Sequence, residues 1–106
     1  MNIINLNKNN FKEEVLNSNI PVLVDFYADW CAPCRMIAPA IESIATDYKG
    51  QIKTCKLNID STPDIPSQYG VMSIPTIIFF KNGTIVDQFT GILPQAQIEE
   101  YIKKHI

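Results

Sequence analysis

Two cysteines three positions apart carry the clearest chemical signal of the sequence. They stand in the run Trp30-Cys31-Ala32-Pro33-Cys34. On a helix, residues three positions apart have Cβ atoms about 5 to 6 Å apart, within adjustment range of the roughly 3.5 to 4.5 Å that a disulfide requires. Cys31 and Cys34 can therefore close into a disulfide and reopen without unfolding the chain. This spacing predicts thiol–disulfide exchange, in which a thiolate attacks a disulfide sulfur.

The pair lies at the start of a predicted helix, and this position gives the two cysteines different roles. Beyond Pro33, apolar residues recur at spacings of four, three and four, which is one face of a helix. Unpaired N–H groups and the positive end of the dipole favour an anion there, so we predict that Cys31 is the attacking thiolate. Cys34 lies one turn inside the helix, more covered, and is predicted to be the resolving thiol. The apolar face consists of Ile37, Ile41, Ile44 and Tyr48.

Zinc binding and inert thiols are the alternatives for the pair. Structural zinc needs four ligands, whereas the sequence has no second cysteine pair and its only histidine, His105, is far away in the sequence. We therefore expect no metal and no bound cofactor. The third cysteine, Cys55, stands alone in the apolar run 52–59, where a free cysteine usually behaves as a small hydrophobic residue. We expect it to fill the core.

Asp25 is the second chemical signal, because it interrupts the otherwise apolar run 22–27. A carboxylate inside such a run is rarely tolerated unless it is paired or functional. Burial should raise the pKa of Asp25, and a group that titrates near neutrality suits a general base for Cys34. The alternative is a structural ion pair with Lys56, predicted to lie on the neighbouring strand. Both interpretations can hold, since such a pair can still relay a proton.

The elements that must position these residues alternate between strand-like and helix-like patterns. Asn82-Gly83 is a strong hairpin signal, so the last two strands should be antiparallel. The other strands alternate with helices, which implies parallel pairing by crossover. The sequence therefore predicts an α/β fold: a mixed sheet with helices on both faces and the run 22–27 at its centre. The predicted strands are 3–6, 22–27, 52–59, 76–80 and 84–89, and the predicted helices are 11–16, one from Pro33 to Gly50, a short one capped by Thr62 with Pro63 as its first residue, and one from Pro94.

Length and composition exclude several classes of protein. A chain of 106 residues fits one domain, residues 1–106. A net charge of −2 gives no reason to expect a nucleic-acid partner. No apolar run approaches the roughly 20 residues that span a bilayer, and residues 1–10 lack the apolar core of a signal peptide. We expect a soluble cytoplasmic protein with no membrane partner.

Six short runs spread over the chain occur together and in order. In combination they resemble the thioredoxin family closely, over essentially the whole chain, whereas a lone pair of cysteines in this spacing would be weak support. They are Val24-Asp25-Phe26, Trp30-Cys31-Ala32-Pro33-Cys34-Arg35, Lys56-Leu57-Asn58-Ile59-Asp60, Tyr69-Gly70-Val71, Ser73-Ile74-Pro75-Thr76 and Lys81-Asn82-Gly83.

The resemblance implies a thioredoxin fold, with a mixed five-stranded sheet and four helices on both faces, and the reduction of protein disulfides. The dithiol would be regenerated by thioredoxin reductase, an NADPH-dependent flavoprotein, and the protein would act as a monomer. Asp25 and Lys56 match the buried acid of the family and its lysine partner. The Ile74–Pro75 bond should be cis and face the cysteines. The implied substrate-binding surface comprises Trp30, Ile74, Pro75 and Gly91 together with Ala32 and Pro33 between the cysteines.

The sequence departs from the family pattern at Ala32, where the family usually has glycine. The residues between the cysteines tune the relative stability of dithiol and disulfide, so Ala32 bears on the redox potential. Two other functions compete with disulfide reduction. One is an oxidant or isomerase of the same fold, and the other is a binding subunit in which the thiols are incidental.

Overall fold

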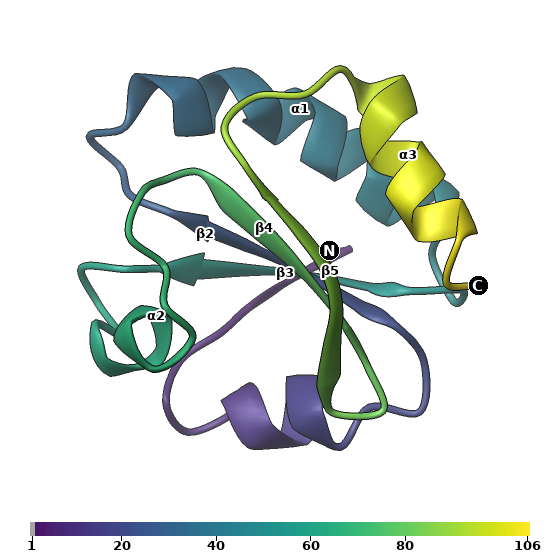
Figure 1. Ribbon diagram of the computed structural model, residues 1–106, viewed down its shortest axis with the longest axis horizontal. Coiled ribbons are helices and arrows are strands. Elements are labelled where there is room, and N and C mark those ends of the chain that lie inside the picture. The colour runs from purple at the N-terminus through teal and green to yellow at the C-terminus, as the bar shows by residue number, and fades with distance from the viewer. Residues whose placement is uncertain (1) are drawn as a thin grey trace.

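The structure, a computed structural model, describes residues 2–106 and contains one five-stranded sheet in the order β1-β3-β2-β4-β5 (Figure 1). The first three strands are mutually parallel, whereas β4 runs antiparallel to β2 and β5 antiparallel to β4. The predicted mixed sheet, with its central strand, is confirmed. The strands are β1 (Ile3–Asn5), β2 (Val22–Tyr27), β3 (Lys53–Asn58), β4 (Thr76–Lys81) and β5 (Thr84–Thr90).

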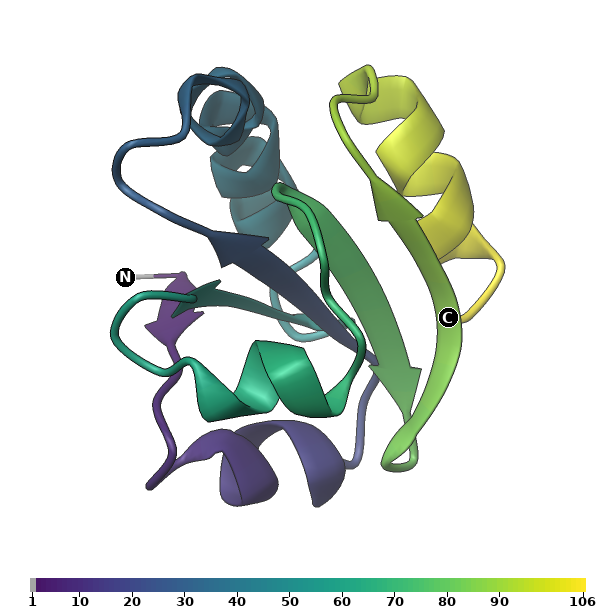
Figure 2. The same cartoon turned by 60° about the vertical axis from the view of Figure 1, so that its left-hand side comes forward.

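Four helices cover the two faces of the sheet, as expected (Figure 2). The helices α1 and α3 pack on one face, and η1 and α2 pack on the other. Alternate residues of β2 point to opposite faces of the sheet. Leu23 packs with α1 and α3, whereas Val24 and Phe26 pack with η1 and α2. Burial on both faces explains why this strand is almost continuously apolar. The helices are η1 (Lys12–Leu16, a π-helix), α1 (Ala32–Asp47), α2 (Asp64–Gln68) and α3 (Gln95–Lys103).

The hairpin between β4 and β5 forms at the predicted dipeptide. Asn82 and Gly83 have φ angles of 53° and 78°. Two consecutive positive φ values are what a tight hairpin turn requires, and asparagine and glycine tolerate them best. This turn brings β5, and Gly91 at its end, back alongside β4 and the Ile74–Pro75 segment.

The long helix α1 begins at the cysteine pair and continues through Pro39. Its predicted apolar face is buried against the sheet, with Ile37 and Ile41 almost fully inaccessible. The start of α2 differs from the prediction, since the helix begins at Asp64 and Pro63 occupies the cap position. No side chain caps this helix, so the predicted cap by Thr62 is wrong; the backbone N–H of Thr62 bonds to the Asn58 carbonyl, 3.1 Å away, in the preceding turn.

Across residues 2–106 the molecule measures 30 × 28 × 25 Å. None of the helices in this part of the chain combines the length and the apolar character needed to cross a membrane.

Candidate active site

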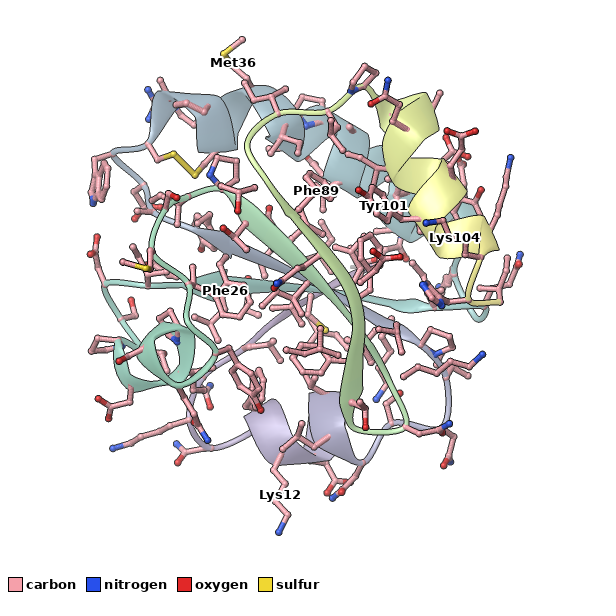
Figure 3. All side chains as sticks on the ribbon, in the orientation of Figure 1. Lys12, Phe26, Met36, Phe89, Tyr101 and Lys104 are labelled. Atoms are coloured by element: carbon pink, nitrogen blue, oxygen red, sulfur yellow. A yellow bond between two sulfur atoms is a disulfide. The ribbon has the colours of Figure 1, made fainter. Side chains whose placement is uncertain are left out.

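Cys31 and Cys34 are joined by a disulfide at the junction of β2 and α1, with their Cα atoms 5.3 Å apart (Figure 3). Cys31 is the N-cap residue of α1 and has an extended backbone, with φ −89° and ψ 108°. Its Sγ accepts the backbone N–H of Cys34 at 3.2 Å. This donor is one of the N–H groups that a helix start leaves unpaired. An N–H group in this position favours negative charge on the sulfur that it contacts.

The two sulfurs differ in their surroundings rather than in their exposure. Cys31 and Cys34 are 5% and 4% exposed, so the expected greater covering of Cys34 is absent in the disulfide form. Both are packed against Ala28 and partly buried apolar neighbours. The Cys31 Sγ lies 3.9 Å from the carbonyl oxygen of Ile74. Cys34 instead lines a small cavity of about 130 Å³ under the start of α1. The two cysteines therefore have different neighbours, the Ile74 carbonyl for Cys31 and the small cavity for Cys34.

Asp25 is buried on the face of the sheet that α1 covers, with 1% of its surface exposed. Neither of its carboxylate oxygens has a hydrogen-bond partner among the described residues. Burial raises the pKa of Asp25 to about 7, while the positive charge of Lys56 acts in the opposite direction. An unpartnered buried carboxylate is costly when ionised. Asp25 is therefore poised to take up and release a proton near neutral pH.

Lys56 lies beside Asp25 in the register of β3 and β2. Its ammonium does not pair with the carboxylate but stands over the Tyr27 ring, 4.4 Å from the ring centre. The ion pair considered from the sequence is therefore not formed. Lys56 and Tyr27 both line the small cavity that Cys34 also lines. The register neighbour of Asp25 and one cysteine of the pair therefore border the same small cavity.

Residues from two loops lie beside the disulfide, at Ile74–Pro75 and at Gly91. The Ile74–Pro75 peptide bond is cis, as the resemblance implied, and Ile74 contacts Cys31. The N–H of Gly91 donates to the Pro75 carbonyl at 2.8 Å. Gly91 has a φ of 96°, and a Cβ atom at this position would meet open space. The structure thus brings Ile74, Pro75 and Gly91 together beside the disulfide.

A groove of about 780 Å³ extends from Trp30 and Ile74, which flank Cys31, to α2. Trp30 forms one wall; the residue is 67% exposed and its Nε1 donates to Asp60 Oδ2 at 2.9 Å. The lining is mainly apolar and carries no charged side chain among the described residues. The lining residues are Trp30, Ile59, Pro63, Pro66, Ser67, Gly70, Val71, Met72, Ser73 and Ile74.

Three features of the site were not found from the sequence. The contact of Tyr27 with Lys56 joins residues on different strands, and only the register of β2 and β3 reveals it. The anchoring of Trp30 by Asp60 spans thirty positions of the chain. Met72 lines the groove and is 96% exposed. A single hydrophobic residue in a loop does not predict such a position.

Cys55 is buried in the core, as expected, on the opposite face of the sheet from α1. Burial raises the pKa of its thiol to about 12. A thiol with so high a pKa is almost entirely protonated at neutral pH and is a poor nucleophile. Cys55 takes no part in the site.

Ala32 is the exposed first residue of α1. Alanine favours a helix over glycine by up to about 1 kcal/mol, and about 30 mV corresponds to 1.4 kcal/mol in a two-electron couple. Ala32→Gly should therefore move the redox potential by no more than roughly 20 to 30 mV, measured by equilibration with glutathione. Ala96→Gly in α3 is the matched control and should leave the potential unchanged. A shift several times larger in Ala32→Gly would mean that the dipeptide acts through something other than helix propensity.

Comparison with known proteins decides the family. The sequence profile of the Thioredoxin family matches residues 2–104. The chain belongs to the thioredoxin family. It is 50% identical to "Thioredoxin 1" of Nostoc sp. over 91% of this chain and 90% of the relative. It is 48% identical to "Thioredoxin" of Rickettsia felis over 96% of this chain and 97% of the relative. It is 43% identical to "Thioredoxin" of Porphyra purpurea over 100% of this chain and 99% of the relative.

Membership of the thioredoxin family and the disulfide at the start of α1 establish the activity. The protein is a dithiol–disulfide oxidoreductase, and its role is that of a protein-disulfide reductase. Its substrates are disulfides, and a reductase returns it to the dithiol form.

Proposed function

We propose that Cys31 attacks the substrate disulfide and that Cys34 resolves the mixed disulfide. The observation that carries this assignment is the N–H of Cys34 on Cys31 Sγ, at 3.2 Å. The Cys31 thiolate bonds to one substrate sulfur, and the other substrate sulfur leaves as a thiolate. Cys34 then loses its proton and attacks Cys31 Sγ, which expels the second substrate thiolate. The substrate gains two electrons, and the protein is left with the Cys31–Cys34 disulfide.

Asp25 is the base that takes the proton from Cys34 in the second step. A general base works best when its pKa lies near the operating pH, and burial raises the pKa of Asp25 to about 7. Asp25 lies on the face of the sheet that α1 covers, and its register partner Lys56 lines the same cavity as Cys34, which supports proton transfer between Asp25 and Cys34. Lys56 tunes the proton affinity of Asp25 and does not touch the substrate.

The outer surface of the disulfide binds an extended segment of the substrate protein. Ile74 and Pro75 border Cys31, and Gly91 leaves open space above the Pro75 carbonyl to which it bonds. The exposed ring of Trp30 and the first turn of α1, with Ala32 and Pro33, border the disulfide from the other side. The apolar groove beside Trp30 extends this surface towards α2.

The chain works as a single domain, residues 1–106, and as a monomer in the cytoplasm. A reducing dithiol fits this compartment, because protein thiols are kept reduced there. Its electron donor is thioredoxin reductase, a flavoprotein that draws on NADPH. The balance of dithiol and disulfide against glutathione separates this function from that of an oxidant or isomerase, which would hold the dithiol form far more readily.

The test is reduction of insulin disulfides by NADPH and a flavoprotein thioredoxin reductase, followed as NADPH consumption. The wild-type protein should support turnover, and Cys31→Ser should abolish it. Cys55→Ala is the matched control: it removes a thiol from the core and should retain turnover. Loss of turnover in the control alone, or full turnover in Cys31→Ser, would contradict the proposed function. A cellular role untouched by Cys31→Ser would instead indicate a binding subunit.

A further inference from the structure

The Lys56 ammonium has two competing partners on one face of the sheet. Lys56 stands directly beside Asp25 in the parallel register of β3 and β2. Tyr27 lies two positions further along β2 and therefore points to the same face as Asp25. The ammonium is 4.4 Å from the centre of the Tyr27 ring, and no hydrogen-bond partner reaches either oxygen of Asp25 within residues 2–106. The cation is held by the ring rather than by the carboxylate.

The other groups around Asp25 do not compensate for the missing partner. On the β4 side its neighbour in the register is Ile77, which is apolar and fully buried. The small cavity that Lys56 lines is also lined by Cys34 and Arg35 of α1 and by Asp29 of the loop before this helix. The guanidinium of Arg35 donates to the backbone oxygen of Asp29 at 2.7 Å. Within residues 2–106, Lys56 is thus the cation whose position decides the charge environment of Asp25.

We propose that Tyr27 is a positioning residue that holds the Lys56 ammonium on its ring and so keeps it from pairing with Asp25. The proposal rests on the proposed role of Asp25 as the base for Cys34. An ammonium is attracted to the face of an aromatic ring by the ring quadrupole. Lys56 is only partly buried there, so its head keeps part of its hydration. Pairing with Asp25 would instead require the ammonium to be desolvated beside a buried carboxylate.

This placement makes Asp25 a better base. An opposite charge within about 4 to 6 Å lowers the pKa of a carboxyl by about 1 to 3 pH units. With the ammonium on the Tyr27 ring, burial dominates and the pKa of Asp25 is about 7. An Asp25 paired with Lys56 would be ionised well below neutrality and would accept a proton from Cys34 less readily. Tyr27 therefore acts on Cys34 through Lys56 and Asp25 without touching the substrate.

The experiment measures the pKa of Asp25 by ¹³C NMR titration of its carboxyl carbon in the oxidised protein, where Cys34 does not titrate. Tyr27→Leu removes the ring, and the pKa of Asp25 should fall by at least about one pH unit. Tyr27→Met is a second variant without a ring and should show the same fall. Tyr27→Phe is the matched control: it keeps the aromatic face, loses only the hydroxyl and should leave the pKa unchanged. In a Lys56→Met background, Tyr27→Leu should have no effect on the titration.

Three results would overturn the proposal: no fall in Tyr27→Leu and Tyr27→Met, an equal fall in Tyr27→Phe, or a fall that persists in the Lys56→Met background. A merely structural role of the ring would not depend on Lys56. The pH profile of mixed-disulfide resolution separates this proposal from the proposed function. If the pKa of Asp25 falls in Tyr27→Leu but the profile does not move with it, Tyr27 still positions Lys56, whereas Asp25 is not the base.

Discussion

Cys34→Ser is expected to accumulate a mixed disulfide with a substrate protein, whereas Cys31→Ser is expected to accumulate none. The first variant keeps the thiolate that the Cys34 backbone N–H stabilises at 3.2 Å, because a side-chain substitution leaves that donor in place. Cys34→Ser can therefore attack a substrate disulfide, but it cannot release the substrate sulfur that is bound to Cys31. The second variant lacks the sulfur that the N–H at the helix start contacts, and the cysteine that remains lines a separate small cavity. The adduct is measured by mass spectrometry after the reduced variants react with a peptide that contains one disulfide.

The amount of adduct from Cys34→Ser relative to that from Cys31→Ser distinguishes the attacking cysteine from the resolving one. A variant with both cysteines replaced by serine, but with Cys55 intact, gives the background, since the Cys55 thiol has a pKa raised by burial to about 12 and is enclosed. Adduct from Cys34→Ser should exceed that background by at least about tenfold, because the thiolate fraction sets the rate of attack. Equal amounts from Cys31→Ser and Cys34→Ser would abolish the assignment, and more from Cys31→Ser would reverse it.

The fold was predictable where local patterns determine structure. The continuous apolar run of β2 indicated burial on both faces, and Asn82-Gly83 fixed the antiparallel hairpin. The spacing of Ile37, Ile41 and Ile44 predicted a helix that begins at the cysteine pair, as α1 does. These signals depend on a few neighbouring residues, so a single sequence contains them in full.

The site was predictable only in part, because its chemistry depends on contacts between distant segments. The burial of Asp25 followed from its apolar neighbours. The sequence did not predict that Lys56 contacts the Tyr27 ring rather than the Asp25 carboxylate, since Asp25 and Tyr27 lie two positions apart on the same face of β2. The similar exposure of Cys31 and Cys34 arises from loops that pack over the helix start, and neither the spacing of the pair nor the helix pattern contains that information.

Asp25→Asn is expected to stabilise the protein at alkaline pH and to slow resolution of the mixed disulfide. The folded-state pKa of Asp25 is about 7 against an ordinary value of 3.8. A carboxyl whose pKa is raised by folding destabilises the native state fully above its folded pKa and not at all below its unfolded pKa. At 1.36 kcal/mol per pH unit this destabilisation reaches about 4 kcal/mol. The neutral amide avoids it, so Asp25→Asn should gain about 2 to 4 kcal/mol at pH 9 and almost nothing near pH 4.

Denaturation of the oxidised protein at pH 4 to 9 measures the gain in unfolding free energy, and stopped-flow measurement of mixed-disulfide resolution measures the loss of the base. Resolution should slow by something like 10²-fold at neutral pH, less if water can accept the proton in place of Asp25. Asp47→Asn is the matched control, because it makes the same substitution at an exposed position at the far end of α1. It should leave the rate unchanged and raise the unfolding free energy by no more than about 1 kcal/mol, since it only removes a negative charge from the C-terminal end of a helix. The two effects have separate causes, since the stability gain needs only burial, whereas the slower rate needs proton transfer. If Asp25→Asn destabilises the protein and still resolves mixed disulfides at the wild-type rate, the carboxylate is structural and Cys34 loses its proton by another route.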